Sequence, residues 1–419
     1  MIDGHYFEET EWSKTQSSLT GLARAARELC VFEKLKQDDT VSCFFDLLEA
    51  ASKEDRAKAR VLQCKFAARL YDHHEANWTK YLTRTVLDMD TCCTYFANRD
   101  HEIPRLMLDA AMRELFALSQ IAMLSSDNLQ AGSDLPVWTV EKVDLQAAFL
   151  DRLMHISTRG SGIYARYNFF RVRIDDGRMQ IVPVAHPDPV TFDQLIGYED
   201  QHEQVVSNTI FLLEGNPASN MLLYGDAGAG KSATVKATVN ALAIKGLRLI
   251  EIDKTQLAYL PELLDELAEN PLKFIVFVDD LSFQENEDGF AALKAVLEGS
   301  VSSRSSNVVV YATSNRRHLV REMNKDETDL HLNDSTQEVM SLSERFGLRV
   351  LFEKPNIEQY RTIVLELAHQ AGLKQSDEQI SAAAECFALH RTGRSARAAR
   401  QLVDQLLAAQ LMEERDADA

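Results

Sequence analysis

The fold is decided by the stretch Gly225-Asp226-Ala227-Gly228-Ala229-Gly230-Lys231-Ser232. This stretch matches the pattern G-x-x-x-x-G-K-[ST] in full. The apolar run Met221–Tyr224 precedes it and the helical run Ala233–Ala243 follows it, so the pattern lies at a turn from a strand into a helix. An ordinary glycine turn is the alternative, but the complete match in this context favours a loop that holds the phosphates of a nucleotide.

Each residue type in this stretch suits a phosphate ligand. Glycines let the backbone turn sharply and bring N–H groups close to phosphate oxygens, and the following helix adds the partial positive charge of its N-terminus. We expect residues 225–233, which end with Ala233, to bind the nucleotide. Lys231 is expected to reach the β- and γ-phosphates, and the Ser232 hydroxyl is expected to ligate Mg²⁺.

Two carboxylates end a later apolar run. Asp279 and Asp280 directly follow Phe274–Val278. A buried strand that ends beside the phosphate loop would let Asp279 hold Mg²⁺ through water and let Asp280 act as the general base on an attacking water. Two exposed acids at a strand end explain the pattern equally well, but their position after the loop favours the functional interpretation. Asp280 is one methylene shorter than the Glu that many ATPases carry there, which is compatible with slow hydrolysis.

The pattern around these motifs predicts an α/β domain. Apolar runs that predict strands recur at 220–224, 247–253, 273–279, 307–313 and 348–352, and helical stretches begin at Lys231, Pro261 and Phe290. Strands of this length, buried on both faces and joined by helices, predict a parallel sheet. After Lys354-Pro355 the pattern becomes purely helical.

The first part of the chain has a different pattern. Residues 1–160 read as helices, most clearly Pro104–Ser125. The runs Tyr164–Ile174 and Met179–Val184 flank an Asp-Gly step, which predicts a β-hairpin, and prolines then place a domain boundary near residue 186. The predicted domains are therefore a helical, partner-binding region at 1–160, a hairpin and linker at 161–185, the α/β domain at 186–355 and a helical domain at 356–419.

Composition narrows the functional classes. The chain has 419 residues, 45% hydrophobic and 26% charged, which is typical of a globular protein with two or three domains. Its formal net charge of −19 disfavours non-specific binding to nucleic acid or to an anionic membrane. Six cysteines without a C-x-x-C pair, a start unlike a signal peptide and apolar runs too short to cross a bilayer predict a cytoplasmic protein.

Further motifs complete a resemblance to the AAA+ family of P-loop ATPases. After the phosphate loop and the two aspartates come Thr313-Ser314-Asn315 at a strand end, Ser343-Glu344-Arg345-Phe346-Gly347, and Gly393-Arg394-Ser395-Ala396-Arg397 in the helical region. The chain is most similar to a bacterial AAA+ family catalogued as a domain of unknown function. It shares with that family the runs Leu249–Lys254, Asp279–Phe283 and Ala312–His318, within a resemblance that covers residues 165–412.

The resemblance implies an α/β P-loop core, a C-terminal helical lid, ATP with Mg²⁺, and a homo-oligomer, with a ring of unknown size. It implies that Asn315 is sensor 1, that Arg345 is an arginine finger for a neighbouring subunit, and that Arg397, or alternatively Arg394, is sensor 2. It also implies that Thr191–Glu199 packs against adenine. From residue type alone, an Asx-turn at Asn315 and surface ion pairs at the arginines remain alternatives.

Three functions follow as expectations. The first is ATP hydrolysis that drives a conformational change on an unidentified protein partner, bound through the N-terminal region. The second is a non-motor ATP-dependent switch or scaffold, because Asp253–Pro261 lacks the aromatic-hydrophobic-glycine loop of protein-threading AAA+ machines. The third is a loader or initiator on DNA. Support for it comes from the basic run Arg316-Arg317-His318 and from the lid arginines Arg391, Arg394, Arg397 and Arg400, whereas the acidic stretch Glu322–Val339 opposes it.

Overall fold

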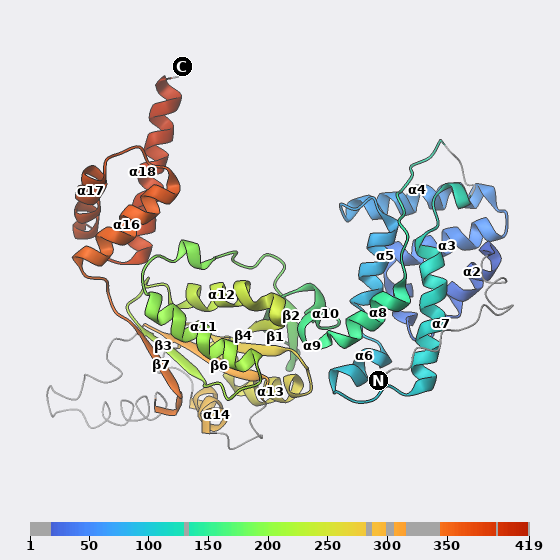
Figure 1. Cartoon of the computed structure of the whole chain (residues 1–419), viewed down its shortest axis with the longest axis horizontal. Coiled ribbons are helices and arrows are strands. Elements are labelled where there is room, and N and C mark those ends of the chain that lie inside the picture. The colour runs from blue at the N-terminus through green and yellow to red at the C-terminus, as the bar shows by residue number, and fades with distance from the viewer. Residues whose placement is uncertain are drawn as a thin grey trace. The chain divides into compact units, whose positions relative to one another are not determined.

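A computed structural model describes residues 18–129, 134–281, 287–298, 306–315, 344–390 and 393–417. The chain divides into two compact units, Met1–Arg166 and Tyr167–Ala419, and each is described by itself (Figure 1). No helix in the described ranges is both long and apolar enough to span a membrane. The six cysteines are free thiols.

The first unit is built from helices around an aromatic core. Its helices are α2 (Leu19–Arg27), α3 (Asp39–Ser52), α4 (Arg56–Asp72), α5 (Trp78–Leu87), α6 (Cys92–Asn98), α7 (Arg105–Ala122), α8 (Leu145–Met154), α9 (Ile156–Arg159) and α10 (Ile163–Arg166), with 3₁₀ turns at Glu33–Gln37 and Asp127–Leu129. The ring of Phe44 stacks on that of Trp78 at 4.3 Å, and the ring of Phe66 lies edge-on to that of Trp138 at 4.7 Å. These contacts bury large apolar rings between α3, α4 and α5 and hold the unit together.

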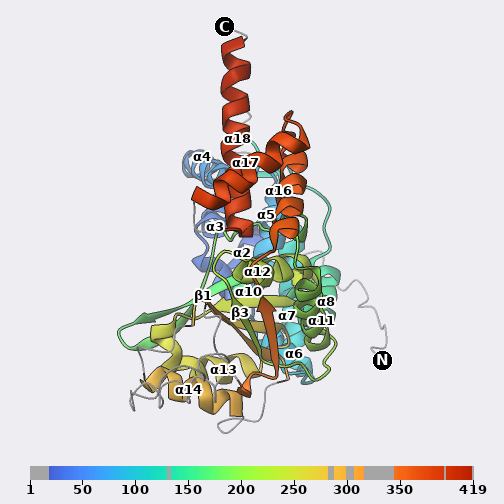
Figure 2. The ribbon, with the colours of Figure 1, turned by 90° about the vertical axis from the view of Figure 1, so that its left-hand side faces the viewer.

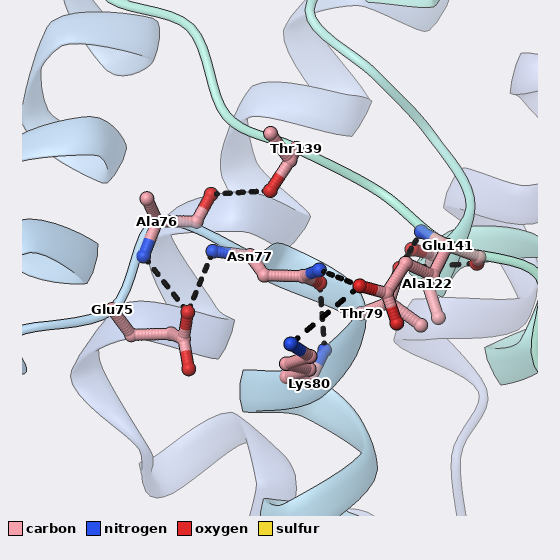
Figure 3. Close-up of polar contacts among 8 residues, drawn as sticks. All are labelled: Glu75, Ala76, Asn77, Thr79, Lys80, Ala122, Thr139 and Glu141. Atoms are coloured by element: carbon pink, nitrogen blue, oxygen red, sulfur yellow. Dashed lines mark hydrogen bonds and ion pairs between the residues drawn. The ribbon is translucent and has the colours of Figure 1, made fainter.

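Polar contacts fix the irregular segment before α8 onto the start of α5 (Figure 3). Asn77 Nδ2 donates to Glu141 Oε1 at 2.7 Å, while the Asn77 side-chain oxygen accepts the N–H of Lys80. The Thr79 hydroxyl donates to the Ala122 carbonyl at 2.7 Å and accepts the N–H of Glu141 at 2.8 Å. Asn77 therefore both caps a helix and anchors a distant segment.

In the described part of the second unit, seven strands form one sheet with the order β2-β1-β4-β5-β6-β3-β7. The strands are β1 (Phe169–Asp175), β2 (Arg178–Pro183), β3 (Met221–Gly225), β4 (Leu247–Glu251), β5 (Lys273–Val278), β6 (Val308–Ser314) and β7 (Leu348–Phe352). β1 and β2 are antiparallel, and every other pair is parallel. The parallel sheet and the hairpin predicted from the sequence are confirmed.

Helices cover both faces of this sheet. α11 (Glu199–Leu213) and α12 (Lys231–Leu242) pack on one face, and α13 (Leu260–Ala268) and α14 (Glu287–Glu298) lie on the other, as Figures 1 and 2 show. Short 3₁₀ turns lie at Phe192–Gln194, Ala243–Lys245 and Lys254–Tyr259. The last three helices are α16 (Ile357–Ala371), α17 (Asp377–His390) and α18 (Ala396–Ala417), and they share an apolar cluster of their own. Within the described residues, the expected helical lid thus consists of α16, α17 and α18, which follow β7 in the chain.

The sequence predicts a hairpin and linker at 161–185, but in the structure the hairpin is part of the sheet. β1 pairs in parallel with β4, with Phe169 opposite Leu249, and Phe170 and Val172 are buried. Phe169 lies on one face of β1, and Phe170 and Val172 lie on the other, so both faces of this part of the strand are buried in the second unit. The division between the units therefore falls after Arg166, rather than near residue 186.

Replacing Phe170 by Ala tests whether the hairpin belongs to this core. Phe170 is fully buried, so its truncation leaves a cavity, and we expect the free energy of unfolding to fall by about 3–5 kcal/mol. Arg173→Ala, at an exposed site of the same strand, should cost less than about 1 kcal/mol. Urea denaturation followed by circular dichroism measures both, and equal effects would argue against packing of β1 on the sheet.

Candidate functional site

The glycine stretch forms the turn that its sequence predicts. β3 ends at Gly225 and α12 begins at Lys231. Gly225, Gly228 and Gly230 have φ values of +129°, +78° and +93°, which other residues rarely adopt. A Cβ at Gly225 would lie 2.2 Å from the Phe352 carbonyl oxygen, so β7 passes too close for any side chain. The turn therefore places the first residues of α12 at the carboxyl edge of the sheet.

Lys231 is held over this turn by oxygen atoms. Its Nζ donates to the carbonyl oxygens of Gly225 at 3.1 Å and Asp226 at 2.7 Å, and to Asn315 Oδ1 at 2.9 Å. Burial lowers the pKa of Lys231, and the carboxylates of Asp226, Asp279 and Asp280 oppose that lowering. The ammonium group is thus placed at the loop with partners that an anionic ligand can replace.

The carboxylate of Asp279 joins the phosphate loop to two strands. Its Oδ1 accepts the hydroxyl of Ser232, at the start of α12, at 2.6 Å. The same oxygen accepts the hydroxyl of Thr313, on β6, at 2.6 Å. A hydroxyl and a carboxylate are the hard oxygen ligands that suit Mg²⁺, so the donor set formed by Ser232 and Asp279 fits this ion.

Asp280 and Asn315 lie beside that pair. Asn315 Nδ2 donates to Asp280 Oδ1 at 2.7 Å, while its Oδ1 accepts from Lys231. Asp280 has a φ of +53°, in the left-handed region that non-glycine residues seldom occupy. The side chain of Asn315 therefore connects the lysine of the loop to the exposed carboxylate of Asp280.

A cavity of about 660 Å³ opens over these groups. That volume is typical of a small-ligand site. Its lining includes residues 227–233 of the loop, Asp279, Asp280, Thr313, Asn315, the segment 194–198, and Ile363, Leu367, Arg397 and Arg400 of the lid. Charged and polar groups gather at the loop, and apolar side chains from the segment and the lid line another part.

The segment predicted to pack against adenine lies on this cavity. Tyr198 precedes α11 with a φ of +66°, and its hydroxyl donates to the Glu353 carbonyl at 2.7 Å. Burial raises the pKa of Tyr198 to about 12. His202 also lines the cavity, with its ring 5.4 Å from that of Phe192, and burial lowers its pKa, which favours the neutral imidazole. A single histidine on a helix carries no sequence signal, so the place of His202 on the cavity could not be predicted.

The lid arginines have different surroundings. Arg397 lines the cavity, and its backbone N–H donates to the Gly228 carbonyl at 3.1 Å. Arg394 instead pairs with Glu385 at 2.8 Å. The structure therefore brings Arg397, and not Arg394, to the phosphate loop.

Arg345 lies elsewhere. It forms an ion pair with Glu298 and lines a second cavity, of about 330 Å³, together with Asn220 and Val308. These residues stand at the amino ends of β3 and β6, whereas the phosphate loop follows the carboxyl end of β3. Arg345 therefore lies at the opposite edge of the sheet from the cavity over the phosphate loop of its own chain.

Some predicted segments fall outside the described residues. They are Ser282-Phe283, Arg316-Arg317-His318, Glu322–Val339, Ser343 and Arg391. Among the residues that are described, no group of three or more His, Cys, Asp or Glu side chains is arranged to hold a metal ion. A magnesium site here would thus depend on the phosphates themselves for further ligands.

Comparison with known proteins gives the family. Residues 165–410 match the family described as "Protein of unknown function (DUF815)". The chain belongs to the DUF815 family. The DUF815 match includes the hairpin, the phosphate loop and the lid, and begins next to the division between the two units. None of the curated proteins compared with the sequence matches it.

Three of the solved structures that match the chain are distantly similar to it. Thermotoga maritima RuvB, a Holliday junction branch migration motor, is 14% identical with a TM-score of 0.36, over 52% of this chain and 63% of that chain. The FIGL-1 AAA domain in complex with ADP is 17% identical with a TM-score of 0.39, over 54% and 75%. The Aeropyrum pernix ORC1 protein in complex with DNA is 19% identical with a TM-score of 0.41, over 55% and 63%. The match thus spans less than two thirds of the RuvB and ORC1 chains.

The architecture of this DUF815 chain is that of an AAA+ P-loop core. The phosphate loop follows β3, which lies between β6 and β7, and β5 and β4 continue the sheet on the β6 side. A helical lid follows β7. The fold class predicted from the sequence is therefore confirmed, with the hairpin as an extension of the sheet beyond β4.

Lys231→Ala should abolish nucleotide binding, because it removes the buried ammonium group from the loop. We expect the affinity for a fluorescent ATP analogue to fall at least about 100-fold, the equivalent of roughly 3 kcal/mol. Lys236→Ala, on the same helix but outside the cavity lining, is the matched control and should bind normally. Normal binding by the Lys231 variant would refute this use of the loop.

Proposed function

We propose that this chain binds ATP with Mg²⁺ and hydrolyses it to ADP and phosphate, and that hydrolysis drives a conformational change on a protein partner. The observation that carries the proposal is the convergence of Lys231, Ser232, Asp279, Asp280 and Asn315 at one glycine-lined turn. These groups come from α12 and from the ends of β5 and β6, so only the folded sheet brings them together.

Residues of this chain would bind the phosphates, accept the proton of the attacking water and hold the metal during hydrolysis. The loop N–H groups and Lys231 would bind the phosphates and stabilise the charge that develops during transfer. Asp280 would accept a proton from the attacking water, in an orientation that Asn315 fixes through its 2.7 Å hydrogen bond. Ser232 and Asp279 would hold Mg²⁺, which when bound supplies positive charge to the phosphate oxygens.

Contacts between core and lid support a conformational role. Ile363 and Leu367 of α16, and Arg397 of α18, line the same cavity as the phosphate loop. Gln370 and Arg400 of the lid donate to the carbonyls of Asp193 and Gln194, at 3.0 and 2.8 Å. A nucleotide that touches both parts would favour a closed arrangement by its differential contacts, and loss of the γ-phosphate would relax it.

Arg345 supports a shared site in an oligomer. Because it lies at the opposite edge of the sheet from its own cavity, it would act on the nucleotide of a neighbouring subunit. An arginine supplied in trans is worth about 10³–10⁵ in rate in phosphoryl transfer. Hydrolysis would then depend on assembly, with the number of subunits set by how neighbours pack.

A switch or scaffold without threading is the second candidate. Residues 254–259 form a 3₁₀ turn that leads into α13, with Leu257 and Leu260 buried and Asp253 as its cap. A segment anchored in this way is poorly suited to gripping a peptide. The DNA alternative has less support, because Arg397 and Arg400 line the nucleotide cavity and Arg394 is paired.

Asp280→Asn should keep ATP binding and lose turnover, since the amide keeps the size of the side chain but cannot accept the proton. We expect the rate of phosphate release to fall about 100-fold or more while the dissociation constant for ATP changes less than about threefold. Capture of partners by this variant, with ATP present, then identifies the client. Asp265→Asn, an acid on α13 away from the cavity, is the control. Normal turnover in the Asp280 variant would show that another group is the base.

Arg345→Ala should spoil hydrolysis and leave binding intact. We expect phosphate release to fall about 10³-fold, with ATP affinity unchanged, because the arginine acts only on the transferring group. Arg349→Ala, at an exposed position of β7, should behave as the unaltered chain. Specific activity should also rise with protein concentration. A variant with normal turnover would exclude the finger role.

A further inference from the structure

Thr313 lies at the centre of the site, although its side chain was not among the predicted site residues. It is the penultimate residue of β6, and its exposed fraction is 2%. Its hydroxyl donates to Asp279 Oδ1 at 2.6 Å and accepts the N–H of Asp280 at 2.9 Å. Its carbonyl accepts the N–H of Leu281 at 2.8 Å. One residue of β6 thus contacts three consecutive residues after β5.

These contacts explain the backbone of Asp280. A left-handed φ at a non-glycine residue costs free energy and persists only where neighbouring groups hold it. Here Thr313 accepts both the N–H of Asp280 and the N–H of the residue after it. The turn sends the side chain of Asp280 toward Asn315, while Asp279 points to Ser232. The two neighbouring carboxylates are therefore separated into different surroundings.

The orientation of Asp279 depends on the same hydroxyl. Its Oδ1 accepts two hydroxyl hydrogens, one from Ser232 and one from Thr313. Two donors from different elements fix the plane of a carboxylate more firmly than one, and such bonds to a charged group are the stronger kind. Because Ser232 belongs to the phosphate loop, the hydroxyl of Thr313 completes a connection from β6 to the loop.

We propose that Thr313 is a positioning residue, whose hydroxyl holds Asp279 for the metal and Asp280 for the attacking water. This inference rests on the proposed function and deepens it. A residue that served only the packing of β6 would affect the stability of the fold. Thr313 contacts both Asp279 and Asp280, so it would affect both the binding of the metal and the rate of hydrolysis. Its effect should therefore appear in the Mg²⁺ requirement and in kcat, and not in the affinity for ATP without metal.

The test compares three variants with the unaltered full-length chain. Thr313→Val keeps the shape and removes the hydroxyl, and Thr313→Ser keeps the hydroxyl. Thr238→Val is the matched control, because Thr238 is also fully buried and its hydroxyl donates to the Thr234 carbonyl at 2.8 Å within α12. Phosphate release is measured against ATP and against Mg²⁺, and binding of a fluorescent ATP analogue is measured in EDTA.

We expect Thr313→Val to lower kcat about 10- to 100-fold and to raise the half-saturating Mg²⁺ concentration about tenfold, with unchanged affinity in EDTA. Thr313→Ser should restore both values to within about threefold, and Thr238→Val should leave them unchanged. If Thr313→Val does not fold, as judged by its thermal unfolding midpoint, Thr313→Ala should give the same profile.

Three results would overturn the inference. A Thr313→Val or Thr313→Ala variant with the kinetics of Thr238→Val would show that the hydroxyl has no positioning role. A Thr313→Ser variant as impaired as Thr313→Val would show the same. A fall in kcat with no change in the Mg²⁺ requirement would exclude the action through Asp279. Failure of the proposed function is distinct, because the unaltered chain would then release no phosphate.

Discussion

The carboxyl ends of β3, β5 and β6 meet at one edge of the sheet, and the rest of the site depends on that meeting. Parallel pairing brings the phosphate loop after β3, the aspartates after β5 and the polar end of β6 to the same edge. The hydrogen bonds of Asp279 to Ser232 and Thr313 then join the three strand ends. Because each bond spans different elements, the site forms only when the sheet is complete.

The same edge couples the site to the lid. Gly228 lacks a side chain, and a Cβ there would lie 3.2 Å from the Cβ of Arg397, so the loop and the start of α18 approach closely. Lid and loop are also joined by the hydrogen bond between the Arg397 N–H and the Gly228 carbonyl. Under the proposed function, a change in the loop on nucleotide binding would reach α18 through these close contacts.

Several features could be predicted because they are local. The glycines of the loop, the Asp-Gly turn of the hairpin and the order of strands and helices depend on residues that are near one another in the chain. The long-range features could not. The pairing of β1 with β4 depends on strands that are about 80 residues apart, and periodicity alone gave no partner for β1.

The site shows the same limit. Asn315 was predicted from a strand end and a family resemblance, yet its bonds to Lys231 and Asp280 are visible only in the fold. Thr313 precedes Asn315 by two residues and carries no distinctive sequence signal, because a threonine near the end of a buried strand is typical of β-structure. His202 was missed for a similar reason, since its neighbours across the cavity come from elsewhere in the chain.

The central claim is that the glycine-lined turn binds a nucleotide triphosphate together with a metal held by Asp279. Isothermal titration of the purified chain with a non-hydrolysable ATP analogue, with Mg²⁺ and then with EDTA, tests it most directly. We expect one site per chain, with an affinity for the analogue that rises at least about tenfold when Mg²⁺ is present. An absence of heat at millimolar analogue, or an affinity that does not respond to Mg²⁺, would contradict it.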